Sequence, residues 1–141
     1  MIRRAELDDI IHLLPLVESF SKEIGLHELF SKKDAARAIA LSIDTGVCYI
    51  DDSYRGLISG TPSPSIWNMH VPILSENIFY VSSEGRRAGI GGDLLRAYGE
   101  DAKEYRLNSP KLMANSPDIE KQYKSLGFTE AETTCMRFNG G

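Results

Sequence analysis

The first 45 residues have the apolar spacing of a short strand followed by two helices. Residues 2–5 can form a strand, and apolar side chains then recur at helical intervals from position 10 to position 20, after Asp8 or Asp9 as the expected N-cap. Pro15 lies inside this pattern, so we expect the helix to be kinked or divided there. Ser31 begins a second helical pattern, which a Thr-Gly pair ends.

After Gly46 the period shortens to that of β-structure. Residues 47–50 and 54–60 are expected to pair as an antiparallel hairpin across a turn at 51–53. Three prolines between positions 61 and 72 are incompatible with a central strand over that whole length, so we expect a loop or an irregular edge. The wholly apolar run at 78–81 predicts a buried strand.

The last third of the chain predicts helices that alternate with strands. A glycine-rich turn at 85–92 leads into an amphipathic helix that we expect to end at Asn108. The elements expected beyond it are a short strand at 111–114, a helix at 119–126 with Gly127 as its C-cap, and a last strand at 133–138. This order indicates one mixed α+β domain over residues 1–141, with one or two parallel crossovers.

Composition narrows the class of protein. Of the 141 residues, 42% are hydrophobic and 26% are charged, as is usual for a globular domain. The net charge of −4 argues against a nucleic-acid partner, which requires a dense basic surface. The charged opening residues are unlike a secretory signal, no apolar run reaches the ~20 residues of a membrane span, and Cys48 and Cys135 lack CxxC spacing. We therefore expect a cytoplasmic protein without membrane contact or a metal centre.

Residues 85–92, Gly-Arg-Arg-Ala-Gly-Ile-Gly-Gly, lie between the apolar strand and the amphipathic helix. Backbone N–H groups that converge at a helix N-terminus, with the positive end of the helix dipole, bind anions such as phosphate or pyrophosphate. Glycines let the ligand oxygens approach closely and allow positive φ. Arg86 and Arg87 add positive charge. A glycine-rich turn that binds no ligand is the competing interpretation.

The spacing of this segment excludes two classes of anion site. A Walker A loop needs Lys-Ser/Thr after its last glycine, where this chain has Gly92-Asp93. A dinucleotide fold needs a different glycine spacing and topology, with an acidic residue at the end of the next strand. The remaining pattern, R-x-x-G-x-G at Arg86, Gly89 and Gly91, resembles the pyrophosphate-binding motif of the GNAT superfamily of N-acyltransferases, which bind acetyl-CoA there.

A second motif strengthens the resemblance. Asn115 follows an expected strand, and Tyr123, Gly127 and Phe128 form the pattern Y-x-x-x-G-F, which is similar to the family's later signature. The opening Ile-Arg-Arg-Ala with Asp9 resembles the family's first strand and helix entry. The departures concern substrate geometry more than cofactor binding: Arg87 where glycine is frequent, Ser83 where proline is usual, and the prolines after Gly60.

The resemblance implies a fold and a cofactor site. The sheet would be mixed and mostly antiparallel, flanked by helices, and splayed between the fourth and fifth strands, with pantetheine in the gap between residues 78–81 and 111–114. The implied cofactor-binding residues are two positions on the fourth strand, the glycine-rich segment and the later asparagine: Phe79, Val81, Arg86, Arg87, Ala88, Gly89, Ile90, Gly91, Gly92 and Asn115.

The implied reaction needs a base for the acceptor ammonium and an acid for the departing CoA thiolate. Tyr123 is the candidate acid, and its alternative is a core tyrosine. Glu76, just ahead of the expected strand, and His70 are the available bases, although each would otherwise be a plain surface residue. Trp67 and Met69 form with His70 either a substrate rim or ordinary packing.

The resemblance therefore implies an acetyl-CoA-dependent N-acetyltransferase that moves an acetyl group directly to a primary amine of a small molecule, peptide or protein. The sequence does not specify the acceptor. Because the chain is short for the family, the alternative is a GNAT-fold protein with weak or no transferase activity that acts by binding another protein. A protein partner or a homodimer is left open.

Overall fold

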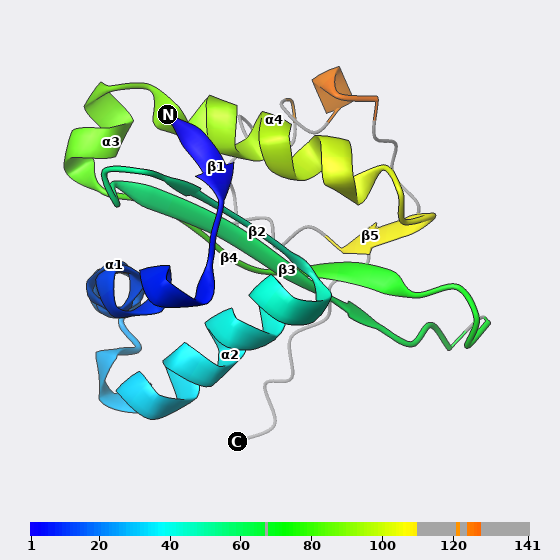
Figure 1. Cartoon of the computed structure of the whole chain (residues 1–141), viewed down its shortest axis with the longest axis horizontal. Coiled ribbons are helices and arrows are strands. Elements are labelled where there is room, and N and C mark those ends of the chain that lie inside the picture. Colours follow the sequence, from blue (N-terminus) through cyan, green and yellow to red (C-terminus); the bar gives the residue numbers. More distant parts are fainter. Residues whose placement is uncertain (67, 110–120, 122–123, 128–141) are drawn as a thin grey trace.

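The computed structural model describes residues 1–66, 68–109, 121 and 124–127 of the chain. These residues form a strand, two helices, three strands, two further helices and a fifth strand (Figure 1). Two short 3-10 turns, η1 (Leu7–Asp9) and η2 (His27–Leu29), precede the first two α-helices. The main elements are β1 (Ile2–Arg4), α1 (Ile10–Glu23), α2 (Lys32–Thr45), β2 (Val47–Asp51), β3 (Gly56–Ser63), β4 (Ile73–Val81), α3 (Ser83–Arg87), α4 (Ile90–Ala102) and β5 (Leu107–Ser109).

The strands form one sheet in the order β1-β2-β3-β4-β5. Neighbouring strands are antiparallel except β4 and β5, which are parallel. This confirms the predicted mixed, mostly antiparallel α+β fold. In the described part of the chain the β4–β5 pairing joins Ile73–Ser75 to Leu107–Ser109. The expected parting of the two strands beyond Ser75 involves positions 110–114, which lie outside that part.

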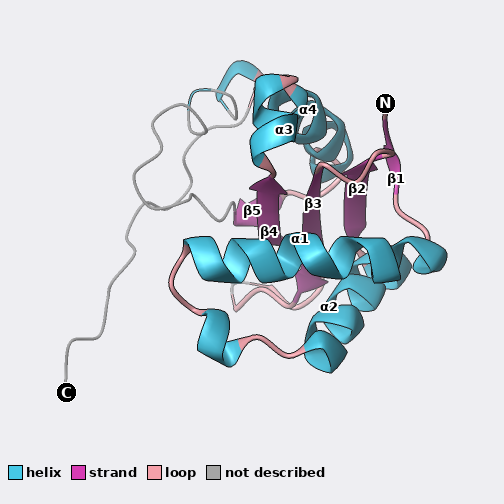
Figure 2. Ribbon diagram, turned by 90° about the vertical axis from the view of Figure 1, so that its left-hand side faces the viewer, coloured by secondary structure: helices cyan, strands magenta, loops and turns pink. Residues whose placement is uncertain are grey.

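Helices cover both faces of the sheet (Figures 1 and 2). On one face α1 and α2 pack over a buried cluster that includes Leu13, Phe20, Ile39, Leu57 and Tyr80. On the other face α4 packs over a second cluster, which includes Ile58, Leu74, Val81, Leu94 and Tyr98. Burying one such side chain contributes about 1.5–3 kcal/mol, so the two clusters fix both helical layers. None of the described helices is long and apolar enough to cross a membrane.

The start of α1 differs from the expectation in two ways. Pro15 lies inside an unbroken α-helix, so the predicted division is wrong. A proline removes the hydrogen bond to the carbonyl four residues earlier, here that of Ile11, an exposed residue at which water can replace the bond. Asp9 precedes the helix as expected but does not cap it, because its carboxylate accepts hydrogen bonds from Arg3, Tyr54 and the Glu6 N–H instead.

The hairpin of β3 and β4 is longer than predicted. Thr61–Ser63 belong to β3 and pair with Ile73–Ser75, so the expected loop begins only at Pro64. Pro62 is tolerated because β2 pairs with β3 only up to Gly60, so that no described strand pairs with this edge of β3 at Pro62. The register shifts between Ser59 and Gly60, with Asn77 as the extra residue of β4.

The helical connections after β4 also differ from the expectation. Ser83–Arg87 form the short helix α3, where an open glycine-rich turn was expected. The helix α4 ends at Ala102, and Asn108 already belongs to β5, so both boundaries were predicted too late in the chain. Asn108 donates to the carbonyls of Ala102 and Tyr105, which holds the connection between α4 and β5. Gly127 has the positive φ, 95°, that its predicted C-cap role requires.

Candidate functional site

Three glycines, which have no side chain, lie at the start of α4: Gly89, Gly91 and Gly92. Gly89 precedes the helix with φ 72°, a left-handed conformation that suits glycine, and offers no side chain to cap the first N–H groups. Gly91 and Gly92 occupy the second and third helical positions. The free N–H groups and the dipole of a 13-residue helix therefore point into a region without side-chain cover from these residues.

Packing within the described chain does not explain the glycines of this turn. A Cβ on Gly91 would lie at ordinary contact distances, 3.6 Å from Val81 Cγ2 and 3.9 Å from Phe79 Cζ. A Cβ on Gly92 would meet no described atom within 4 Å. Glycine inside a helix costs about 1 kcal/mol relative to alanine. The sequence therefore keeps two destabilising residues at a helix N-terminus, and no contact among the described residues gives a steric reason for them.

Gly85 has a different role, because it lets the connection before α4 pass close to the sheet. A Cβ there would lie 2.7 Å from both the Arg55 carbonyl oxygen and Val81 Cγ1. Ser82 begins α3: its hydroxyl accepts from the Gly85 N–H at 3.2 Å, and its own N–H donates to the Arg55 carbonyl at 2.8 Å. These contacts attach α3 to Arg55, the residue just before β3, and fix where α4 starts.

The two arginines of the segment differ in their surroundings. Nη2 of Arg86 donates to both carboxylate oxygens of Glu23, the last residue of α1, at 2.9 and 3.0 Å. Its guanidinium also lies 5.6 Å from the centre of the Tyr80 ring. Burial and then the neighbouring Glu23 raise the pKa of Tyr80. Arg87 is exposed and forms no ion pair with any residue that the structure describes.

Phe79 and Val81 lie under the first turn of α4. Both belong to the core cluster of that face, where Val81 is buried and Phe79 is partly buried. The expected cofactor-binding residues of β4 and of the glycine segment are thus brought together by the packing of α4. Asn115 lies outside the described residues, as does Tyr123 of the second motif.

Glu76 was expected just ahead of the strand, but it lies inside β4. It is 6% exposed, so it is not a plain surface residue either. It follows Leu74 by two positions and therefore faces α4 with it. Burial, then the charge of Glu76, raise the pKa of Tyr98, which lies on α4 in the same layer. The extra residue Asn77 then reverses the alternation, so that Phe79 and Val81 share this face.

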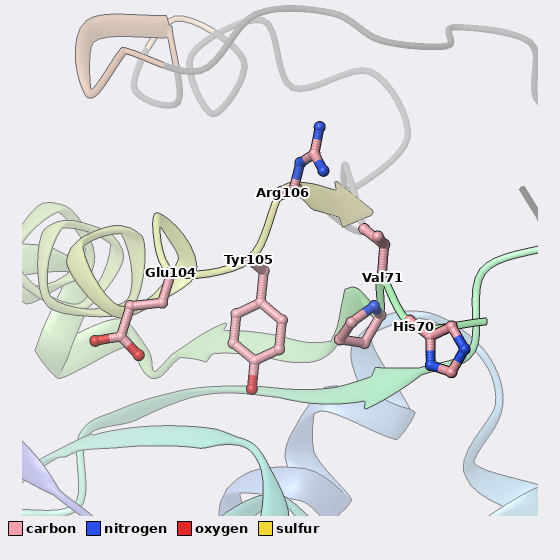
Figure 3. A pocket seen from close by; sticks show the side chains of 6 residues that line it. His70, Val71, Glu104, Tyr105 and Arg106 are labelled. Carbon is pink, nitrogen blue, oxygen red and sulfur yellow. The ribbon is translucent and has the colours of Figure 1, made fainter. Parts of the chain in front are cut away.

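The second candidate base lies at the opposite end of α4 from the glycines. His70 is exposed and lines an open hollow of about 320 Å³ with Val71, Pro72, Glu104, Tyr105 and Arg106 (Figure 3). Tyr105 and Arg106 point in opposite directions from the connection between α4 and β5. A helix of 13 residues is roughly 20 Å long, so this hollow is separate from the anion-binding turn. Met69 is exposed, and Trp67 lies outside the described residues.

Among the described residues that contact the glycine-rich segment, Glu23 was missed by sequence reasoning. It stands 63 positions before Arg86, and its place at the end of a polar helical turn predicts only a solvent-facing carboxylate. No local motif could have indicated the pair, because the contact depends on how α1 packs across the sheet.

Comparison with solved structures identifies the fold. A probable acetyltransferase is 20% identical, with coverage of 100% of this chain and 99% of that one and a TM-score of 0.73. A ribosomal-protein-alanine N-acetyltransferase from Brucella melitensis biovar Abortus 2308 is 16% identical, with 99% of each chain covered and a TM-score of 0.67. An aminoglycoside 6'-N-acetyltransferase from Acinetobacter haemolyticus is 15% identical, with coverage of 99% of this chain and 97% of that one and a TM-score of 0.64.

Comparison of the sequence with protein-family models and with curated proteins finds no match. The structural comparisons confirm the fold that the resemblance to the GNAT superfamily implies.

Proposed function

We propose that this chain, which has the fold of GNAT acetyltransferases, is an acetyl-CoA-dependent N-acetyltransferase acting on a primary amine. The observation that carries the proposal is the glycine pair in the first turn of α4. Gly91 and Gly92 weaken the helix without relieving any contact among the described residues, and they leave its N–H groups open to an anion. A diphosphate that must approach the backbone closely explains glycines at these positions.

The residues present fit the cofactor. The N–H groups at the start of α4 would hold the pyrophosphate, and the segment before the helix carries the exposed Arg87. The edge of β4 at Phe79 and Val81 would bind the pantetheine amides as an added strand would. Asn115, from the second motif, completes the proposed set. Acetyl-CoA itself would supply the acetyl group as a thioester.

Two side chains are proposed to move protons. Glu76 would accept the proton of the acceptor ammonium, directly or through water, so that the free amine can attack the thioester carbonyl. Tyr123 would donate its phenolic proton to the sulfur as the carbon–sulfur bond breaks. If Tyr123 has this role, Tyr123→Phe lowers turnover at saturating acetyl-CoA, and unchanged turnover would exclude it as the acid.

The fold does not select the acceptor. The two named relatives act, by their names, on a ribosomal protein alanine and on an aminoglycoside, although both share this fold. We propose only that the acceptor is a primary amine. A net charge of −4 favours a cationic acceptor slightly through electrostatic steering. A cytoplasmic location is proposed from the sequence alone.

The first experiment is calorimetric titration with acetyl-CoA, with CoA and ATP in parallel. Gly89→Asp places a carboxylate beside the proposed phosphate site, and Gly89→Asn is its matched control. Both side chains tolerate the left-handed backbone of position 89, so the two variants differ mainly in charge. We expect wild-type protein and Gly89→Asn to bind acetyl-CoA, and Gly89→Asp to bind at least about tenfold more weakly.

Two results would contradict the proposal. Folded wild-type protein that does not bind acetyl-CoA would move the assignment to the alternative in which the fold serves to bind another protein. Equal loss in Gly89→Asp and Gly89→Asn would attribute the effect to backbone strain and remove the evidence for an anion site.

A further inference from the structure

The motif arginine of this site is already paired with an acidic residue of a distant helix. Arg86 donates from Nη2 to both oxygens of Glu23, and its guanidinium is stacked near the Tyr80 ring. The Glu23 carboxylate thus accepts hydrogen bonds that the Arg86 guanidinium would otherwise be able to donate to a phosphate oxygen. Both side chains are about half exposed, so the pair is accessible to solvent and its strength depends on salt.

The pair lies on the opposite face of the sheet from the first turn of α4. Tyr80 belongs to the core cluster under α1 and α2. Val81 and Phe79, which approach Gly91, belong to the cluster under α4. Successive residues of a strand face opposite sides of the sheet, so the guanidinium above Tyr80 is held toward α1. The charge of Arg86 is therefore drawn away from the helix N-terminus at which the anion would bind.

Arg87 has no acidic partner of this kind among the described residues. It is the last residue of α3, two positions before Gly89, and it makes no ion pair within the described residues. It is also exposed, so no described side chain has to be displaced before its guanidinium can bind an anion.

We propose that Glu23 is a positioning residue that withholds Arg86 from the cofactor, and that Arg87 supplies the side-chain cation for the phosphates. This inference rests on the proposed function and deepens it. It assigns unequal roles to the motif arginine and to its neighbour at a variable position of the motif, and it gives α1 a direct influence on cofactor affinity.

Identical substitutions at adjacent positions test the assignment. Acetyl-CoA affinity is measured calorimetrically at low and high salt for Arg86→Gln, Arg87→Gln, Glu23→Gln and the double variant Glu23→Gln/Arg86→Gln. We expect Arg87→Gln to weaken binding about fivefold or more at low salt, with a smaller effect at high salt. Arg86→Gln should change the affinity by less than about twofold, because its charge is already neutralised by Glu23.

The Glu23 variant supplies a readout that a merely structural bridge would not move. Glu23→Gln releases Arg86 and should tighten acetyl-CoA binding about two- to fivefold at low salt, and the gain should vanish in the double variant. Thermal unfolding of each variant confirms that it is folded.

The outcomes separate this inference from the proposed function. If the wild type binds acetyl-CoA but Arg86→Gln weakens binding as much as Arg87→Gln, the assignment of the cation is wrong. If Glu23→Gln leaves affinity unchanged or weakens it, Glu23 does not withhold Arg86. If the folded wild type does not bind acetyl-CoA at all, the proposed function fails and the inference fails with it.

Discussion

The hydroxyl of Tyr98 on α4 lies directly against Gly60 of β3, so that a Cβ at position 60 would collide with it. The same Cβ would lie 3.0 Å from the Ser75 carbonyl oxygen on β4. Tyr98 is only 2% exposed and cannot swing into solvent. Gly60 therefore permits α4 to pack on the sheet beside the register shift in the hairpin.

Gly60→Ala is expected to lower the free energy of unfolding by about 2 kcal/mol, because the added methyl group overpacks this contact. Gly92→Ala is the matched control: its methyl group meets no described atom, and the helix should gain up to about 1 kcal/mol. Urea unfolding measures both. In a Tyr98→Phe background the penalty of Gly60→Ala should shrink, and an undiminished penalty would show that Tyr98 is not its cause.

Asp9 should make stability depend on pH in the acid range. The Arg3 guanidinium, at 2.8 Å from both carboxylate oxygens, is the main cause that holds the pKa of Asp9 well below its ordinary value. A lowered folded-state pKa stabilises the protein above the unfolded-state value of about 4, and this contribution is lost as the pH falls further.

Asp9→Asn should therefore lower stability by about 2 kcal/mol at pH 7 and flatten its fall between about pH 5 and pH 3. Asp8→Asn, the exposed neighbour, is the control and should do neither. Urea unfolding across this pH range gives both quantities. An Asp9→Asn curve parallel to the wild type would contradict the role of Asp9. Asp51, whose pKa the adjacent Arg55 lowers, keeps part of the acid dependence in every variant.

Gly92→Asp should separate stability from cofactor binding. At the third position of α4, replacing glycine by an acidic residue near the positive end of the helix should raise the free energy of unfolding by about 0.5–1 kcal/mol. The same carboxylate should weaken acetyl-CoA binding at least about tenfold by repelling the phosphates. Gly92→Asn tests the volume without the charge. A stabilised Gly92→Asp that binds like wild type would exclude phosphates from this turn.

Glu76→Gln should lower kcat by about a hundredfold or more and leave the Kd for acetyl-CoA unchanged, if Glu76 accepts the proton of the amine. Steady-state kinetics with a competent amine and calorimetry with acetyl-CoA give the two values. Glu104→Gln, in the hollow at the far end of α4, is the control with expected wild-type kinetics. A parallel loss of cofactor binding would instead indicate that the buried Glu76 supports the strand rather than the reaction.

Local features were predictable where a single side chain, or its absence in glycine, determines the backbone conformation. The Ser31 hydroxyl accepts from the Asp34 N–H and begins α2, and that helix ends at Thr45 before Gly46, as the pattern indicated. The motif around Gly89 and Gly91, together with the second motif at Asn115 and Tyr123–Phe128, indicated the fold through its resemblance to the GNAT superfamily and led to the proposed cofactor.

The pairings between distant elements were decided only by the tertiary structure. Pro62 reads as a strand breaker, yet it lies in β3 because β2 has already ended beside it. The sequence predicts that Glu76 is a surface carboxylate ahead of a strand. It is buried instead, because β4 already begins at Ile73 and Glu76 lies within the hairpin. Glu23 and Arg86 meet across 63 residues. Each result depends on which backbone or side chain lies alongside, and packing between elements determines this, whereas local sequence preference does not.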